Sequence, residues 1–279
     1  MTGSLDWARL ILREDARSGG ADHLAEPWAI KLNEARLSSF LAVDGNASDN
    51  EREAFLSGDI TDLQSRLNVA NLIEGDAVSE PALASFARLF ELLGLQESQL
   101  TLLAGQLLRA SQNARQMSAE AVLLSAFTSP ADAPLMPQRI EELVWLGLDQ
   151  GSLQRLAPFI TFLPEKTGVN LNTASPEVIF ASNPGLEMAE AQKLVAVRER
   201  SHFRTLADAI RQINNPQAQL SLAQHVVASR FFEVRGRLRL DQSAVEERSV
   251  MQRDGLVVKT LWRSRGVIAS QAAQGSVLP

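Results

Sequence analysis

The spacing of apolar residues divides the chain into a helical start, a long helical middle and a strand-forming end. Near the start, four apolar residues recur at helical spacing: Leu5, Ala8, Leu12 and Ala16. This period predicts an amphipathic helix over residues 5–17, which Ser18-Gly19-Gly20 ends. The stretch 27–41 fits either a strand or a short helix, and a strand is predicted over 58–62.

The middle of the chain is predicted to be helical. Apolar residues follow the helical period there, and the breaks fall at Gly, Pro and Asn. The expected helices cover residues 81–93, 97–114, 117–127, 137–146, 153–159, 176–182, 187–200, 205–210 and 216–228. Residues 77–228 are therefore predicted to form a helical domain.

From Arg230 onward the period falls from about four residues to two. Two sets of side chains alternate along residues 230–240: Phe232, Val234, Leu238 and Leu240 on one side, and Glu233, Arg235, Arg237 and Arg239 on the other. This alternation predicts a half-buried antiparallel strand. Further strands are expected over 245–252 and 256–263, and Asp254-Gly255 between them is a strong hairpin signal. Residues 270–279 are expected to form a tail.

These elements together predict an α+β fold. A lone amphipathic helix cannot bury its apolar stripe, and a three-stranded meander needs a cover for its apolar face. The simplest solution packs the helix at 5–17 on the C-terminal strands. Residues 1–76 and 229–279 then form one discontinuous α/β domain, and residues 77–228 are a large all-α insertion.

Two short helices, 176–182 and 187–200, flank Asn183-Pro184-Gly185 and predict a helix-hairpin-helix-like motif. In DNA-binding versions of this motif, bare backbone N–H groups of a glycine-rich turn approach a phosphate. Here Glu187 and Glu190 adjoin the turn, and their charge repels phosphate. A structural hairpin is the main interpretation, and a DNA-binding helix-hairpin-helix protein is the alternative.

The same stretch resembles a known family signature. Its residues are Val169-Asn170-Leu171-Asn172-Thr173-Ala174, Pro184-Gly185-Leu186, Ala191, Arg198, Phe203, Leu206 and Asp208. They are similar to the signature of the minor pseudopilin K (GspK) family of the type II secretion system. A second segment of that family resembles Gly58-Asp59-Ile60-Thr61-Asp62 followed by the run 66–72.

The resemblance implies a pilin-like helix and antiparallel sheet that carry an inserted helical domain. It also implies a role at the tip of a periplasmic pseudopilus, in a complex with the minor pseudopilins I and J. That complex is expected to initiate fibre assembly, limit fibre growth and contact exported substrates. The expected partner interface is the apolar stripe of the first helix: Leu5, Ala8, Leu12 and Ala16.

Members of that family are anchored in the bacterial inner membrane by a long apolar N-terminal helix. No apolar run in this chain approaches the roughly 20 residues that a bilayer requires. The resemblance therefore implies a periplasmic domain whose anchoring helix is absent from this sequence.

Composition narrows the chemistry. The net charge of −6 and the pI near 5.3 argue against a general nucleic-acid binder. Cysteine is absent, so the chain has no disulfide and no thiolate metal site. The three histidines, His23, His202 and His225, lack zinc-site spacing, and no nucleotide-binding or hydrolase motif occurs. We therefore expect a non-enzymatic protein without a catalytic residue, and calcium is the one candidate cofactor.

One polar stretch bears on metal binding. Alternating oxygen-bearing side chains surround Gly45 and resemble a loose calcium loop with these candidate ligands: Asp44, Asn46, Asp49 and Glu51. The complete EF-hand pattern is missing, so an exposed acidic loop and a calcium loop both stay open. Farther on, Arg66, Asn68 and Asn71 are expected to satisfy buried carbonyl groups.

Overall fold

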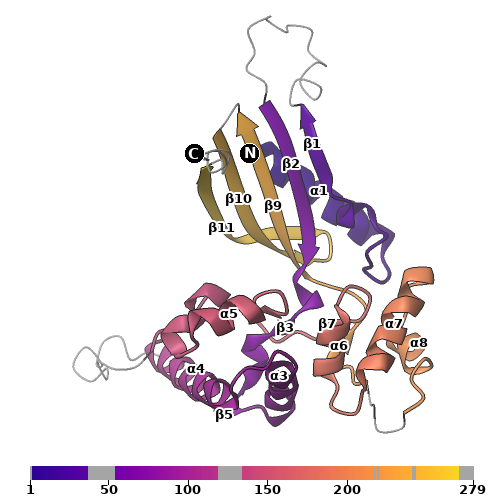
Figure 1. Cartoon of the computed structure of the whole chain (residues 1–279). Helices are drawn as coiled ribbons and strands as arrows, with labels where there is room; N and C mark the ends of the chain where they lie inside the picture. The colour runs from indigo at the N-terminus through magenta and orange to yellow at the C-terminus, as the bar shows by residue number, and fades with distance from the viewer. Residues whose placement is uncertain are drawn as a thin grey trace, which may run out of the picture. The chain divides into compact units, whose positions relative to one another are not determined.

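The computed structural model describes residues 2–36, 54–118, 134–215, 218, 220–240 and 243–269. The chain forms two compact units (Figure 1). Unit 1 comprises Met1–Leu63 and Ser229–Pro279, and unit 2 comprises Gln64–Ala228. The sequence pattern predicted that the helical domain begins at residue 77, whereas unit 2 begins at Gln64. The stretch 64–76 groups with unit 2 because Leu67, Val69 and Leu72 lie in the hydrophobic core of that unit.

Unit 1 is a helix packed on a five-stranded antiparallel sheet. Its elements are α1 (Thr2–Ser18), η1 (Pro27–Ala29), β1 (Leu32–Arg36), β2 (Ala54–Asp62), β9 (Phe231–Leu240), β10 (Ser243–Asp254) and β11 (Val257–Ala269). The strand order is β1-β2-β9-β10-β11, and every pairing is antiparallel. The stretch 27–41, which the sequence left open, begins as a short 3₁₀ turn and continues as a strand.

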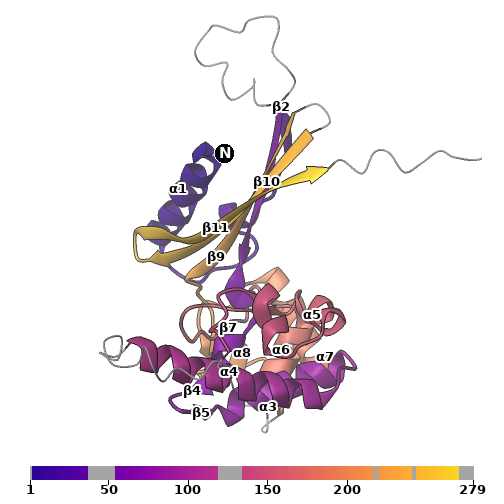
Figure 2. The same ribbon diagram turned by 90° about the vertical axis from the view of Figure 1, so that its left-hand side faces the viewer.

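Helix α1 lies along one face of this sheet, as Figure 2 shows, and its apolar stripe packs against that face. The core it closes contains Leu5, Ala8, Leu12, Trp28, Ile60, Phe232, Val234 and Met251. Trp28 is the largest of these side chains, and its ring meets the Phe232 ring edge-on with 5.3 Å between centroids. The predicted packing of the first helix on the C-terminal strands is therefore confirmed.

The predicted alternation along β9 holds at its start, where Phe232 and Val234 face α1, but not throughout, because Leu240 is 37% exposed and Glu233 is fully buried. Along β11 the predicted alternation of side chains is interrupted at one position. Thr260 pairs with Met251 and Trp262 pairs with Val250, so one extra residue interrupts the register. This bulge turns Trp262 to the opposite face of the sheet from Thr260, whereas the sequence pattern placed both on one face.

Unit 2 is mainly helical. Its helices are α3 (Glu80–Leu92), α4 (Glu97–Ser118), α5 (Gln150–Leu156), α6 (Pro176–Ser182), α7 (Met188–Arg200) and α8 (Leu206–Ile210), with 3₁₀ turns η4 (Val69–Leu72) and η7 (Ile140–Leu146). Another 3₁₀ turn, η3 (Leu63–Ser65), leads into the unit from β2. The described part of this unit also contains three two-stranded pairs: β3 (Leu67–Asn68) with β6 (Ile160–Thr161), β4 (Ile73–Glu74) with β5 (Ala77–Val78), and β7 (Val169–Asn170) with β8 (His225–Val226).

Among the described residues, which leave out most of the helix predicted over 117–127, one predicted helix is wrong. The described part of 216–228 holds no helix, and His225–Val226 forms β8 instead. The N–H groups of Val169 and Leu171 donate to the carbonyls of Gln224 and Val226, at 2.8 and 3.0 Å. A pairing between distant segments thus overrides the local helical spacing. The helix predicted over 137–146 forms as a 3₁₀ turn over 140–146.

Helices and an antiparallel sheet together give the predicted α+β class. Among the residues that the structure describes, none of the helices combines the length and the apolar character needed to cross a bilayer.

Candidate functional site

The four predicted calcium ligands, Asp44, Asn46, Asp49 and Glu51, lie outside the described residues. The prediction of a calcium loop therefore stays a prediction.

The structure gives most of the predicted partner interface a different role. Leu5, Ala8 and Leu12 are at most 4% exposed, because they cover the sheet of unit 1 itself, and Ala16 is half-buried. The exposed apolar side chains of α1 are Trp7 and Leu10, which are 48% and 46% exposed.

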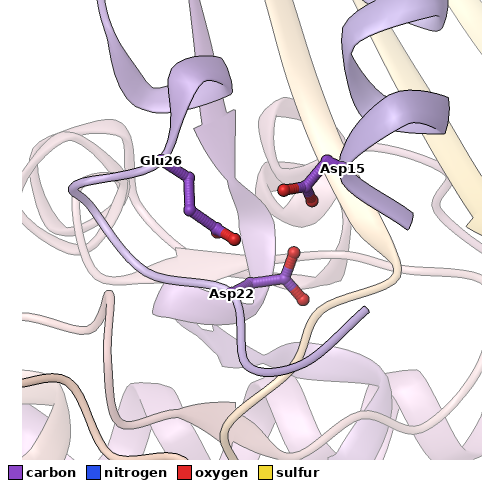
Figure 3. A group of neighbouring side chains, drawn as sticks. All are labelled: Asp15, Asp22 and Glu26. Carbon is purple, nitrogen blue, oxygen red and sulfur yellow. The ribbon is translucent and has the colours of Figure 1, made fainter. Parts of the chain in front are cut away.

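A group of carboxyls that the sequence did not predict lies at the end of α1 (Figure 3). Asp15 comes from the last turn of α1, and Asp22 and Glu26 come from the segment that follows the helix. Oxygen atoms of all three lie within 4.8 Å of one another. Like charges at this spacing repel, so the surroundings decide whether all three ionise.

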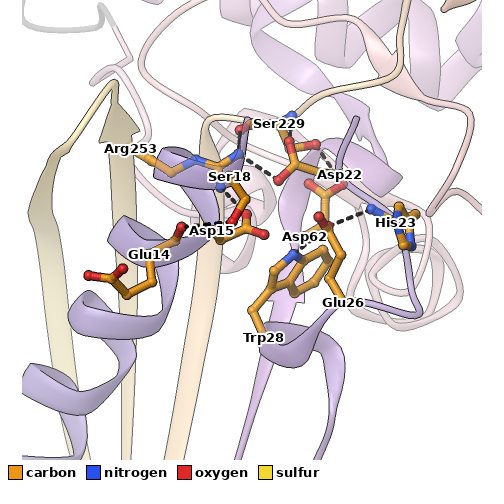
Figure 4. A network of polar contacts seen from close by, with 10 residues as sticks. All are labelled: Glu14, Asp15, Ser18, Asp22, His23, Glu26, Trp28, Asp62, Ser229 and Arg253. Carbon is orange, nitrogen blue, oxygen red and sulfur yellow. Dashed lines mark hydrogen bonds and ion pairs between the residues drawn. The ribbon is translucent and has the colours of Figure 1, made fainter. Parts of the chain in front are cut away.

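Arg253 of β10 holds this group to the sheet, as Figure 4 shows. Its guanidinium donates to Asp15, to Asp22 at 2.5 Å and to the carbonyl of Ser229 at 2.8 Å. Asp22 also accepts the N–H of Ser229 at 2.6 Å, and the Ser229 hydroxyl donates to Asp62 at 2.6 Å. Asp22 and Asp62 are both 2% exposed, so this network lies inside unit 1.

Glu26 has a different set of donors. One of its oxygens accepts the backbone N–H of His23 and the indole N–H of Trp28, both at 2.8 Å. Burial raises the pKa of Glu26 to about 7, against the lowering effect of these two donors and with the help of Asp15. Burial likewise raises the pKa of Asp22 to about 6, although Arg253 opposes it. The network therefore favours uptake of protons near neutral pH.

In the turn between α6 and α7, the N–H groups of Gly185, Leu186 and Glu187 already have acceptors within the hairpin. The N–H groups of Gly185 and Leu186 donate to the side-chain and backbone oxygens of Asn183, at 3.1 and 3.0 Å. The N–H of Glu187 donates to Glu190 in a capping box. The geometry therefore gives no support to the DNA-binding alternative.

The carbonyl groups of the same hairpin are held by Arg88 of α3. Its guanidinium donates to the carbonyls of Phe180, Pro184 and Leu186, at 3.2, 3.0 and 2.7 Å. It also stacks over the Phe180 ring, 3.9 Å from the ring centroid. Arg88 thus binds the carbonyls on both sides of Gly185, whose own carbonyl accepts from Asn215 at 2.8 Å.

We expect Arg88→Ala to destabilise unit 2 by about 2–3 kcal/mol, because three charge-assisted hydrogen bonds to one turn are lost together. Urea unfolding measures the change in stability, and hydrogen exchange of the α6 and α7 amides reports on the hairpin itself. Arg109→Ala on the exposed side of α4 is the control and should change stability by less than about 0.5 kcal/mol. Equal effects of the two substitutions would contradict this role of Arg88.

A buried serine and histidine in unit 2 form a structural pair. His225 is 0% exposed, and burial lowers its pKa to about 4, so the ring is neutral near pH 7. Its Nδ1 accepts the N–H of Ser221 at 3.3 Å, so the ring proton lies on Nε2 and points to the Ser182 hydroxyl at 3.1 Å. Ser182 in turn donates to the carbonyl of Ile179 at 2.9 Å. A histidine in this tautomer does not accept the serine proton.

The asparagines of the signature segments are structural as well. As predicted, Asn68 and Asn71 donate to the carbonyls of Glu165 and Thr167, both at 2.8 Å. Asn172 exchanges two hydrogen bonds with the backbone of Phe203, at 2.8 and 2.9 Å. These contacts hold the turn-forming segments of unit 2 in place.

Comparison with known proteins agrees with this geometry. Residues 65–165 match a family model described as type II secretion system protein K, and residues 169–232 match a second model with the same description. Together the two matches cover more than half of the chain. The chain belongs to the type II secretion system protein K family.

A curated relative within the protein K family supports this membership. The chain is 29% identical over 289 residues to type II secretion system protein K of Pseudomonas aeruginosa PAO1. The alignment covers 97% of this chain and 78% of the relative.

A solved structure shows the same fold. It is the crystal structure of the GspK-GspI-GspJ complex from the type 2 secretion system of enterotoxigenic Escherichia coli. One chain of that complex matches with a TM-score of 0.64 at 18% identity, covering 95% of this chain and 94% of that one. At this identity the likeness concerns the fold.

Proposed function

We propose that this chain is a minor pseudopilin at the tip of the type II secretion pseudopilus, where it forms a complex with the minor pseudopilins I and J. The observation that carries the proposal is membership of the protein K family over more than half of the chain. The fold it shares with a chain of the E. coli complex supports the same partners. In this role the protein initiates the fibre, limits its growth and contacts exported substrates.

The two units suit different parts of this task. Unit 1, with one helix on an antiparallel sheet, corresponds to a pilin-like domain that joins the fibre. Unit 2 interrupts it in sequence with 165 residues, the size of an ordinary domain, and supplies the bulk that blocks a further subunit. The role is one of assembly and not of catalysis. We also propose that the protein lies in the periplasm, anchored to the inner membrane.

The test is to mix this protein with the soluble domains of I and J from the same bacterium and to measure the mass by light scattering after size exclusion. The expected result is a complex with one copy of each chain. Three separate peaks at micromolar concentration would contradict the proposal. Retention on duplex DNA that salt abolishes would instead favour the DNA-binding alternative.

We place the contact with I and J on the outer side of α1, at Trp7 and Leu10. These residues lie three positions apart, which puts them on one face of the helix, opposite the stripe that covers the sheet. An aromatic anchor beside an aliphatic side chain is typical of the centre of a protein interface. Their exposure in the isolated chain is explained if a partner covers them.

The double substitution Trp7→Ala, Leu10→Ala should weaken the complex by about 10- to 100-fold, the usual effect of removing interface anchors. Titration calorimetry with preformed I–J complex measures this. The matched control is Trp145→Ala, Leu102→Ala in unit 2, a similarly exposed pair at 62% and 46%. If instead the unit 2 variant weakens binding by about 10- to 100-fold and the α1 variant leaves binding unchanged, the interface lies on unit 2.

A further inference from the structure

Unit 2 contains a pocket with a volume of about 180 Å³. Its walls come from β3, η4, β4, the first turns of α3, the stretch that leads into β7, the end of α6 and the stretch before β8. Protein interiors are close-packed and leave few voids larger than a water molecule. An engineered cavity of about 150 Å³ in another protein binds benzene, so this pocket has room for about one ring or one branched side chain.

The inner wall of the pocket is apolar. Leu67, Phe86 and Val169 line it and are at most 5% exposed, so they form its floor. Four polar side chains of the wall already donate to carbonyl groups of unit 2: Asn68, Asn71, Ser85 and Ser182. A group that enters the pocket therefore meets mainly apolar surface, which favours an apolar ligand group.

The mouth of the pocket carries one cation and one anion. Lys166 and Glu74 line it, with side chains that are 49% and 68% exposed and 3.3 Å between Nζ and Oε1. An ion pair this exposed contributes little to stability, so turning its members toward a ligand costs little. Gln224 belongs to the same lining. Its Oε1 accepts from the Ser221 hydroxyl at 3.4 Å, and its Nε2 has no partner in the described part of the chain.

We propose that this pocket binds a free amino acid whose apolar side chain is about the size of one ring, such as phenylalanine or leucine. The side chain occupies the floor, the α-carboxylate accepts from Lys166 and Gln224, and the α-ammonium donates to Glu74. A zwitterion suits this lining because each of its charges meets an opposite charge, whereas a ligand with one charge also meets a like charge. The proposal concerns unit 2 alone and does not depend on the proposed partners.

The first test titrates the whole protein with phenylalanine and follows the backbone amides by NMR. Saturable shifts are expected at Leu67 and Val169, with a Kd on the order of 0.1–1 mM for so small a ligand. Two blocked forms separate the charges, since N-acetylphenylalanine lacks the ammonium and phenylalanine amide lacks the carboxylate. Each should bind about tenfold more weakly, because one charge-assisted hydrogen bond is lost.

Two results of this titration would overturn the proposal. If either blocked form binds as tightly as phenylalanine, the ligand is not recognised as a zwitterion. If the amides that line the pocket show no saturable shift up to about 10 mM phenylalanine, the pocket is not an amino-acid site.

The second test changes the pocket itself. Lys166→Met removes the cation from a half-exposed side chain, so the fold should be unchanged while phenylalanine binds about tenfold more weakly. Ala82→Leu fills the pocket from α3 and should abolish the shifts. The matched control is Lys193→Met in α7, an exposed lysine outside the lining, which should bind like wild type. Wild-type affinity in Lys166→Met would contradict the proposed site.

Discussion

Trp28→Ala is expected to destabilise unit 1 by about 3–5 kcal/mol, the usual cost of removing a large aromatic side chain from a core. Trp28 is 1% exposed and packs edge-on against Phe232 beneath the stripe of α1. Its indole N–H also donates to Glu26, so the substitution removes packing and one donor of the carboxyl network. Urea unfolding, with hydrogen exchange of the β9 and β10 amides to report on unit 1, measures the effect.

Two control variants separate the causes. Trp28→Phe keeps an aromatic ring but loses the N–H donor, so it should cost clearly less than Trp28→Ala. Trp7→Ala removes the same side chain from the exposed side of α1 and should change stability by less than about 1 kcal/mol. A small effect of Trp28→Ala would mean that α1 and η1 do not close the core as described.

Arg253→Met is expected to destabilise unit 1 by a similar amount, about 3–5 kcal/mol at pH 7. Methionine keeps much of the arginine volume but carries no charge, so Asp15 and Asp22 lose their shared counter-ion in a buried place. The carbonyl of Ser229 also loses a donor at 2.8 Å. Urea unfolding of wild type and variant at pH 7 gives the difference in unfolding free energy, and hydrogen exchange of the β9 and β10 amides again reports on unit 1.

The Arg253→Met penalty should shrink on acidification. The pKa of Asp22 is already raised to about 6 by burial with Arg253 present, and loss of the guanidinium raises it further. At pH 5 the carboxyl is then largely neutral and costs less to bury. Arg263→Met on β11, whose side chain is 46% exposed and 3.8 Å from Glu247, serves as the control. A penalty that is the same at pH 5 and pH 7 would show that lost packing, and not charge, dominates.

Local periodicity predicted the elements that bury one regular face. Phe232 and Val234 of β9 and the stripe from Leu5 to Leu12 lie where the pattern placed them, since burial of a helix face or strand face leaves a repeating signal. The hairpin signal at Asp254-Gly255 also corresponds to the β10–β11 turn, in which Gly255 has a φ of 55°. Such features depend on neighbours in sequence.

What the sequence did not predict depends on partners far away along the chain. Arg253 binds Asp15 and Asp22, which lie more than 230 positions away in the sequence, and no local sequence pattern predicts such a contact. Trp28 lies in a three-residue 3₁₀ turn, which is too short to show a period. The available signal was two acids, Asp22 and Glu26, close to a tryptophan in a segment that otherwise resembles a loop.

The predicted partner interface shows the same limit. An amphipathic stripe identifies the face of α1 that is buried, but it does not say whether the sheet of the same chain or another protein buries it. The structure assigns the stripe to the sheet, and the interface is therefore proposed at Trp7 and Leu10.

The most direct test of the proposed tip role is cross-linking from single cysteines, because the chain has no cysteine of its own. Leu10→Cys and Leu102→Cys are equally exposed sites, each 46%, on α1 and on α4 of unit 2. Each variant is labelled with a photoreactive probe, mixed with the soluble I and J domains and irradiated. The account predicts cross-links to I or J from position 10 and far fewer from position 102. A complex that cross-links from position 102 but not from position 10 would contradict it.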